Sequence, residues 1–192
     1  MRFAILGLGT VGKGVVKLLQ ESREMLQLKT GLNLELAKVL VRDASKPRPG
    51  FEGLPLTEDV NEILDDPSIR IVVELMGGIE PARTYLVEAL RRGKTIVTAN
   101  KDVMADYDKD LYDAGEIGDA EIYFEAAVGG GIPIIRPLKE ALAANTMRQV
   151  MGIVNGTTNY ILTQMSQYGR SYEEALQEAQ ALGYAEPDPT ND

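Results

Sequence analysis

Apolar positions along the first 125 residues follow two alternating periods. Short apolar runs at residues 3–6, 34–41, 69–75, 95–98 and 120–125 predict strands. Between these runs, apolar residues recur every three to four positions and predict helices over residues 11–19, 60–64, 81–91 and 103–114. Prolines and glycines between residues 43 and 57 indicate a loop. Strands that alternate with helices predict an α/β fold with a Rossmann-like, doubly wound parallel sheet, because right-handed crossovers place helices on both faces.

The pattern changes after residue 132. A helix is expected over residues 133–144, a strand over 147–154, and two helices over 157–167 and 172–182. We place a domain boundary near residue 135, which gives domains of residues 1–135 and 136–192. The second is an incomplete α+β domain, because one strand cannot close a sheet.

Composition excludes several classes of function. The net charge of −9 repels nucleic-acid phosphates, so no nucleic-acid partner is expected. No apolar stretch approaches the ~18 residues of a membrane span, and the N-terminus lacks a signal-peptide pattern, so no membrane association and a cytoplasmic location are expected. The chain has no cysteine and no histidine, which leaves acid–base work to Lys, Asp, Glu or Tyr. This suits hydride transfer, in which a cofactor carries the difficult chemistry.

The glycine pattern Gly7-x-Gly9-x-x-Gly12 follows the first predicted strand and opens the first predicted helix. In that context it is typical of dinucleotide binding. Gly7 allows a tight turn, Gly9 lets the backbone approach a pyrophosphate, and Gly12 lets helix and strand pack closely. The amides of Thr10 and Val11 belong to the positive end of the helix. The alternative is a purely structural glycine turn.

The end of the second strand bears on the choice of cofactor. Enzymes that prefer NAD usually carry an acid there, whereas this chain has Arg42, followed by Asp43, Lys46 and Arg48. A guanidinium suits the additional phosphate of NADP. We therefore expect NADP(H) to be preferred, with NAD(H) still possible through Asp43. The alternative for Arg42 is a solvated loop charge.

Three further segments are candidates for ligand contacts. Thr98-Ala-Asn-Lys101 follows a strand and thus lies at the carboxyl edge of the sheet, where Lys101 is either a solvated charge or the partner of an anion. The glycines of Val128-Gly-Gly-Gly131 can turn carbonyls toward a hard cation or form an interdomain hinge. Asn155-Gly-Thr157-Thr reads as a turn into an N-capped helix.

Five blocks of the chain together resemble the homoserine dehydrogenase family, which reduces aspartate 4-semialdehyde to homoserine in threonine, methionine and isoleucine biosynthesis. The resemblance implies an oxidoreductase that uses a nicotinamide cofactor, acts on a small-molecule substrate and forms homodimers. It also identifies residues 136–192 as the start of the substrate domain. The blocks are Gly7-Leu-Gly-Thr-Val-Gly12, Thr98-Ala-Asn-Lys101, Glu125-Ala-Ala-Val-Gly-Gly-Gly-Ile-Pro133, Gly152-Ile-Val-Asn-Gly-Thr-Thr-Asn-Tyr-Ile-Leu162 and Gly183-Tyr-Ala-Glu-Pro-Asp-Pro189.

The resemblance also implies roles for individual residues. Lys101 would lie where cofactor and substrate meet, with Thr98 beside the cofactor. Gly183 would touch the cofactor, Thr157 would lie near the substrate, and Glu186 would bind the substrate ammonium, with Asp192 as a further acid of that pocket. A structural sodium ion would be held by the residues Glu125, Val128, Gly130 and Ile132.

The family pattern continues past Asp192 into a substrate-binding Asp and a proton-donor Lys. We therefore expect this chain to bind the cofactor without turning over substrate. The alternatives are a truncated NADP-binding module without catalysis and another oxidoreductase of the same fold. The blocks that begin at Gly152 and Gly183 argue against the last of these.

Overall fold

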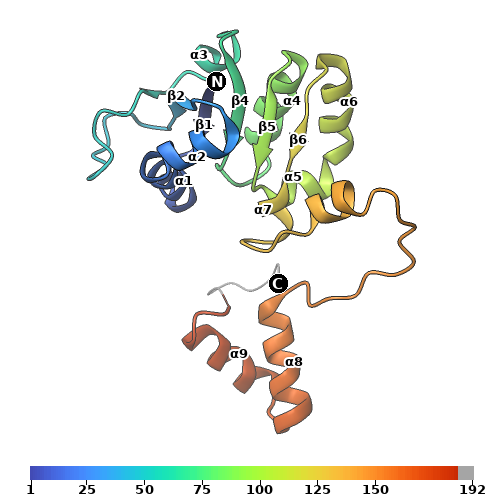
Figure 1. Ribbon diagram of the computed structural model, residues 1–192. Coiled ribbons are helices and arrows are strands. Elements are labelled where there is room, and N and C mark those ends of the chain that lie inside the picture. The colour runs from blue at the N-terminus through green and yellow to red at the C-terminus, as the bar shows by residue number, and fades with distance from the viewer. Residues whose placement is uncertain (186–192) are drawn as a thin grey trace. The chain divides into compact units, whose positions relative to one another are not determined.

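The computed structural model describes residues 1–185 and divides into two compact units, Met1–Ala144 and Asn145–Asp192 (Figure 1). The domain boundary expected near residue 135 stays a prediction, because compactness alone does not define a family domain.

The first unit is built on six parallel strands in the order β3-β2-β1-β4-β5-β6. This order reverses direction at β1, as in doubly wound dinucleotide-binding sheets, and confirms the expected fold class. One strand, β3, was not expected, because it is two residues long and lies inside the proline- and glycine-containing loop. The strands are β1 (Arg2–Leu6), β2 (Glu35–Leu40), β3 (Leu56–Thr57), β4 (Ile69–Glu74), β5 (Thr95–Thr98) and β6 (Ile122–Tyr123).

Helices connect the strands of this unit. The single helix expected over residues 103–114 is two helices, because Tyr107 leaves the helical region with a φ of −134°. Helix α2 was not expected, and none of its eight residues is buried. The helices are α1 (Thr10–Glu21), α2 (Arg23–Thr30), α3 (Asn61–Leu64), α4 (Ala82–Arg91), α5 (Lys101–Asp106), α6 (Asp108–Gly118) and α7 (Glu125–Val128).

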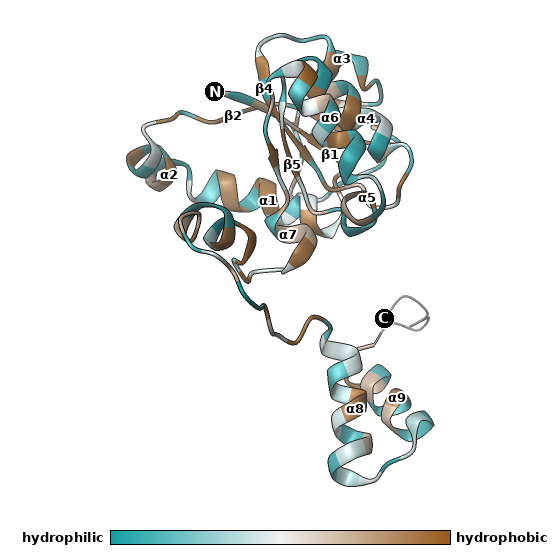
Figure 2. Ribbon diagram, turned by 90° about the vertical axis from the view of Figure 1, so that its right-hand side faces the viewer, coloured by the Kyte–Doolittle hydropathy of each residue, from teal (hydrophilic) through white to brown (hydrophobic). Residues whose placement is uncertain are grey.

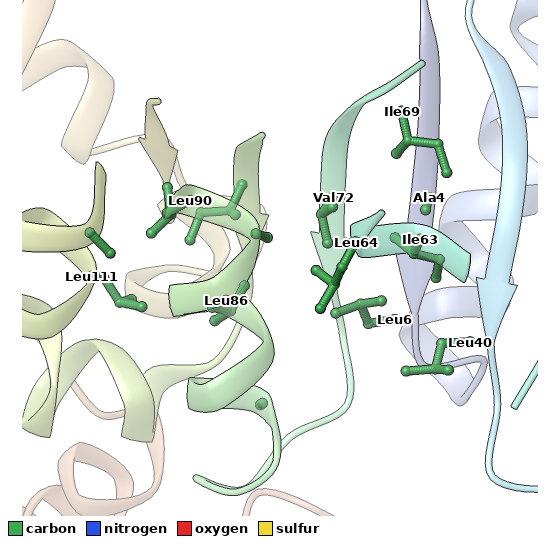
Figure 3. Packing of buried hydrophobic residues seen from close by; sticks show 14 of the residues in the cluster. Ala4, Leu6, Leu40, Ile63, Leu64, Ile69, Val72, Leu86, Leu90 and Leu111 are labelled. Carbon is green, nitrogen blue, oxygen red and sulfur yellow. The ribbon is translucent and has the colours of Figure 1, made fainter. Parts of the chain in front are cut away.

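Successive residues of β1 point into two separate cores, one on each face of the sheet. Phe3 and Ile5 pack with Val16 of α1. Ala4 and Leu6 belong to the larger cluster, which α3, α4, α5 and α6 complete. Figure 3 shows part of this cluster, including leucines of α4 beside a leucine of α6. Figure 2 shows polar and apolar residues mixed along α1, as expected for a helix with one buried side.

The segment after β6 differs from expectation. The helix expected over residues 133–144 is reduced to a short helical segment that includes the π-helix Pro137–Ala141. The prediction of a strand over residues 147–154 was wrong. This segment is irregular and its side chains are exposed, and Val154 is 98% exposed. An extended segment becomes a strand only where a neighbour accepts its backbone hydrogen bonds, and no described strand pairs with it.

The second unit contains two of the expected helices, α8 (Gly156–Tyr168) and α9 (Tyr172–Ala181). They enclose a small core of Ile161, Ala175, Ala179 and Ala185. Helix α9 starts with a capping box between Ser171 and Glu174. No helix among the described residues of either unit is long and apolar enough to cross a membrane.

Candidate cofactor-binding site

The turn between β1 and α1 is shaped by two glycines that leave no room for a side chain. Gly7 has a φ of +99°, and a Cβ there would lie 2.8 Å from the carbonyl oxygen of Leu75. A Cβ on Gly12 would lie 2.3 Å from the carbonyl oxygen of Gly7. Gly9 differs, because no atom of the chain lies within 4 Å of the position of its Cβ. We call the turn closed at Gly7 and Gly12, where a side chain would clash, and open at Gly9, where it would not.

The open side of this turn faces a pocket of 730 Å³ that also reaches the end of β2. Helix α1 starts at Thr10, and the exposed residues Gly9, Thr10 and Val11 form its positive end. An anion entering the pocket would meet this helix end. The pocket is lined by Gly7, Gly9, Arg42, Asp43, Lys46 and Arg48, among others.

Asp43, the first acid of the loop after β2, is engaged by a residue of the same loop. Asp43 accepts hydrogen bonds from the backbone amide and the hydroxyl of Ser45, at 2.8 and 2.6 Å. These bonds from Ser45 hold the pKa of Asp43 below its ordinary value. Arg48 donates to the carbonyls of Lys46 and Asp43, each at 2.7 Å, and fixes the loop backbone. Arg42 and Lys46 are both exposed at the pocket, so either cation is available to a ligand.

The carboxyl ends of β4 and β5 are joined by a buried polar network. The carboxylate of Glu74 accepts from the amides of Met76 and Gly77, at 2.7 and 3.3 Å, and from the hydroxyl of Thr98 at 2.6 Å. Asn100 extends the network, since its amide group donates to the carbonyl of Gly78 at 2.7 Å.

The same network also caps the N-terminus of α5. The carbonyl oxygen of the Asn100 side chain accepts from the amide of Val103 at 3.2 Å and caps the helix. Lys101, the first residue of α5, is exposed at this edge of the sheet. Thr98, in contrast, is buried, and its hydroxyl is engaged with Glu74. The edge therefore presents Lys101 to solvent and keeps Thr98 inside.

Sequence reasoning missed Glu74 and Asn100 as candidate site residues. Glu74 is fully buried and Asn100 is 5% exposed. The available signal was an acid at the end of a strand that is apolar apart from Arg70, because a buried carboxylate requires hydrogen-bond partners. The partners themselves come from a loop and from another strand, which no local pattern identifies.

The glycine-rich segment after β6 forms a compact loop. The amide of Gly129 donates to the carbonyl of Glu125 at 3.0 Å, and the amide of Ile132 donates to the carbonyl of Gly129 at 3.3 Å. The Glu125 carboxylate accepts from the amides of Ile134, Ile135 and Arg136. These amides, led by those of Arg136 and Ile134, hold the pKa of Glu125 below its ordinary value. The Glu125 side chain is therefore occupied by the backbone of its own loop.

The second unit brings two of the sequence blocks together. Thr157 is 8% exposed and donates from its hydroxyl to the carbonyl of Tyr184 at 2.6 Å. The rings of Tyr160 and Tyr184 lie 5.1 Å apart. A cavity of 530 Å³ lies beside these residues, and Gly183, with a φ of +76°, lies directly before Tyr184. Glu186 and Asp192, the expected substrate acids, lie outside the described residues.

The strand order, with a glycine turn opening α1 where the order reverses, defines a dinucleotide-binding protein of Rossmann type. A family model described as "Homoserine dehydrogenase, NAD binding domain" matches residues 7–125, and one described as "Homoserine dehydrogenase" matches residues 133–192. The chain belongs to the homoserine dehydrogenase family, which is a family of oxidoreductases.

Individual relatives agree with this assignment. The homoserine dehydrogenase of Bacillus subtilis is 49% identical over all of this chain, which spans 45% of that protein. The Corynebacterium glutamicum enzyme is 47% identical over 98% of the chain, which spans 42% of that protein. The chain thus spans less than half the length of these curated relatives.

Solved structures are also similar. A homoserine dehydrogenase from Thiobacillus denitrificans matches the whole chain with a TM-score of 0.89 and 44% identity, and the chain covers 44% of it. A hyperthermophilic archaeal homoserine dehydrogenase in complex with NADPH matches with a TM-score of 0.81 and 26% identity, and the chain covers 64% of it.

Proposed function

We propose that the full-length protein is an NADP(H)-preferring homoserine dehydrogenase that interconverts aspartate 4-semialdehyde and homoserine in threonine, methionine and isoleucine biosynthesis. The observation that carries this proposal is the glycine turn, open at Gly9 and closed at Gly7 and Gly12, in a chain that both family models match. When bound, the nicotinamide supplies or accepts the hydride.

In this proposal the cofactor lies along the carboxyl edge of the sheet. Gly9 admits the pyrophosphate to the positive end of α1, where the amides of Thr10 and Val11 donate to it. Because β2 and β4 lie on opposite sides of β1, the adenosine half extends over β2 and the nicotinamide half over β4 and β5.

The preference for NADP(H) rests on the loop after β2. The 2′-phosphate would meet Arg42, with Lys46 and Arg48 nearby. Asp43 is the acid that could bind the ribose hydroxyls of NAD, but Ser45 already holds its carboxylate. The archaeal relative named as an NADPH complex supports the same preference.

Lys101 is the side chain that we assign to the junction of cofactor and substrate. Lys101 is exposed at the carboxyl edge of the sheet, beside which the nicotinamide half is proposed to lie. Its ammonium group suits a substrate carboxylate or a developing alkoxide. Thr98, buried beneath it, supports this edge. Lys101 would thus orient the substrate and stabilise negative charge.

The substrate's amino-acid end would be held by the second unit. We assign Glu186 and Asp192 to the substrate ammonium, since two carboxylates favour a cation. Thr157 holds the carbonyl of Tyr184 and thereby supports the segment that leads to Glu186. Gly183 would contact the cofactor. Its left-handed backbone favours glycine, and glycine has no side chain to obstruct the approach of the cofactor.

A structural sodium ion is proposed at the glycine-rich loop. Backbone carbonyls of Glu125, Val128, Gly130 and Ile132 form a neutral donor set of the kind that suits a hard monovalent cation. The Glu125 carboxylate is taken up by backbone amides, so its carbonyl is the donor that we assign. We also propose that the full-length enzyme is a cytoplasmic homodimer, as its family and biosynthetic role suggest.

The test is NADPH oxidation by the full-length protein with aspartate 4-semialdehyde, followed by ultraviolet absorbance. Succinic semialdehyde is the matched control, because it keeps the aldehyde and one carboxylate but lacks the ammonium that the two acids would recognise. We expect turnover with the first aldehyde only. Tight NADPH binding without oxidation would favour the alternative, an NADP-binding module without catalysis.

A further inference from the structure

Glu74 is a fully buried carboxylate at the end of β4, and its environment accounts for both of its oxygens. One oxygen accepts the two amides of the Met76–Gly77 turn, and the other accepts the hydroxyl of Thr98 on the neighbouring strand. A buried carboxylate that lacked such donors would be strongly destabilising. Glu74 therefore ties the end of its own strand to the end of β5.

The network closes on itself. Thr98 accepts the amide of Asn100 at 3.0 Å, and Asn100 donates from its side chain to the carbonyl of Gly78 at 2.7 Å. The turn after β4 is thus held at its start by Glu74 and at its end by Asn100. Because Asn100 also caps α5, the same ring of bonds sets the position at which Lys101 leaves the sheet.

The direction of these bonds requires an acceptor at both oxygens of residue 74. The Thr98 oxygen accepts the amide of Asn100, and the hydroxyl donates its one proton to the carboxylate of Glu74. The two turn amides are donors as well. A carboxylate accepts on both sides, whereas a glutamine would place its NH₂ group either against the turn amides or against the Thr98 oxygen, and in the second case the Thr98 proton would lose its acceptor.

We infer that Glu74 is a positioning residue for the nicotinamide half of the cofactor. It acts through the turn of residues 76–78 and through the cap of α5, which lie at the edge assigned to the nicotinamide. The pyrophosphate and adenosine contacts are proposed at the turn after β1 and at the loop after β2, and of the residues that Glu74 holds only Met76 also lines that pocket. The inference rests on the proposed function for the direction in which the cofactor lies.

The test compares two ligands, NADP⁺ and 2′-phospho-ADP-ribose, which is the same molecule without nicotinamide. Calorimetric titration gives the ratio of the two affinities for the wild-type chain, for Glu74→Gln and for the control Glu80→Gln. Glu80 is a half-exposed surface residue paired with Arg83, three positions further on. We expect Glu74→Gln to lower NADP⁺ affinity about tenfold, the equivalent of one misdirected buried hydrogen bond, with 2′-phospho-ADP-ribose affinity unchanged and the control unaltered.

A second variant covers the case in which Glu74→Gln fails to fold. Thr98→Val keeps the side-chain shape and deletes the hydroxyl that Glu74 accepts, so it should lower the same ratio. Equal losses for both ligands would reduce Glu74 to a general structural role and overturn the inference, as would an unchanged ratio in both variants. A wild-type chain that binds neither ligand would instead reject the proposed function, and this inference with it.

Discussion

Three glycines of one turn and one helix should respond to the same change, Gly→Ala, in three different ways. At Gly12 the new methyl group would lie 2.3 Å from the carbonyl oxygen of Gly7, which is backbone and has no rotamer to give way. Overpacking of this kind costs about 1–3 kcal/mol, whereas the gain from replacing glycine within a helix is about 0.5–1 kcal/mol. We therefore expect Gly12→Ala to lose about 1–2 kcal/mol of unfolding free energy.

Gly9→Ala should lower NADPH affinity with little change in the unfolding free energy. Its backbone has a φ of −78°, which alanine adopts readily, and nothing in the chain lies within 4 Å of the new methyl group. The unfolding free energy should change by less than about 0.5 kcal/mol. The methyl group would, however, stand where the pyrophosphate is proposed to approach. A steric cost of about 1–3 kcal/mol there corresponds to roughly a 5- to 150-fold loss of NADPH affinity.

Gly14 supplies the matched control. It lies in the same helix, has no neighbour within 4 Å of its Cβ position and lies away from the turn, so Gly14→Ala should gain about 0.5–1 kcal/mol and bind NADPH normally. Urea unfolding and calorimetric titration of the three variants give both quantities. The reasoning would be refuted if Gly9→Ala kept full affinity, or if it lost as much stability as Gly12→Ala.

Three further outcomes are expected. Arg42→Ala should lower NADPH affinity by about 1–3 kcal/mol in calorimetry while NADH affinity stays the same, and equal changes for both cofactors would identify a solvated loop charge. Lys101→Ala in the full-length protein should lower turnover at least about 100-fold with no loss of thermal stability, because a cation at a helix start is unfavourable; near-normal turnover would contradict the assigned role. The lowered pKa of Glu125 means that its loop is stabilised above the ordinary carboxyl pKa and loses this contribution as pH falls through the lowered value. The protection factor of the Ile135 amide, which compares its exchange rate with the unprotected rate at the same pH, should therefore fall at acid pH in wild type but not in Glu125→Gln.

The fold of the first unit followed from the chain's periodicity, because each buried strand and each half-buried helix repeats its own period. The exceptions have physical causes. Helix α2 has eight residues and buries none of them, so its apolar residues do not mark a buried side. The segment over residues 147–154 has the pattern of a strand but no described partner, and a strand is defined by its partner. The local pattern of apolar residues thus predicts elements that bury side chains. It fails where a strand depends on pairing with another strand.

The candidate site divides in a similar way. The geometry of the glycine turn and the position of Arg42 after β2 could be predicted, because a strand, a turn and a helix in fixed order leave little choice of where the backbone goes, and their contacts with a cofactor stay predictions. The role of Thr98 as a buried donor to Glu74 could not, since it depends on two strands that meet only in the folded sheet. The expected contact between Thr157 and substrate stays a prediction, and its hydroxyl is seen to hold the carbonyl of Tyr184.

The loop after β2 has a consequence for how cofactor choice can evolve. Residues 42–47 are exposed, and the loop is fastened largely by its own bonds, from Ser45 to Asp43 and from Arg48 to the backbone. None of these bonds reaches the buried cores of the sheet, so mutations here escape the stability constraint that governs the glycine turn. Replacement of Arg42 would remove a cation, and replacement of Ser45 would release the carboxylate of Asp43. Neither change disturbs packing. Selection for one redox pool or the other can therefore act on this loop while the rest of the domain stays unchanged.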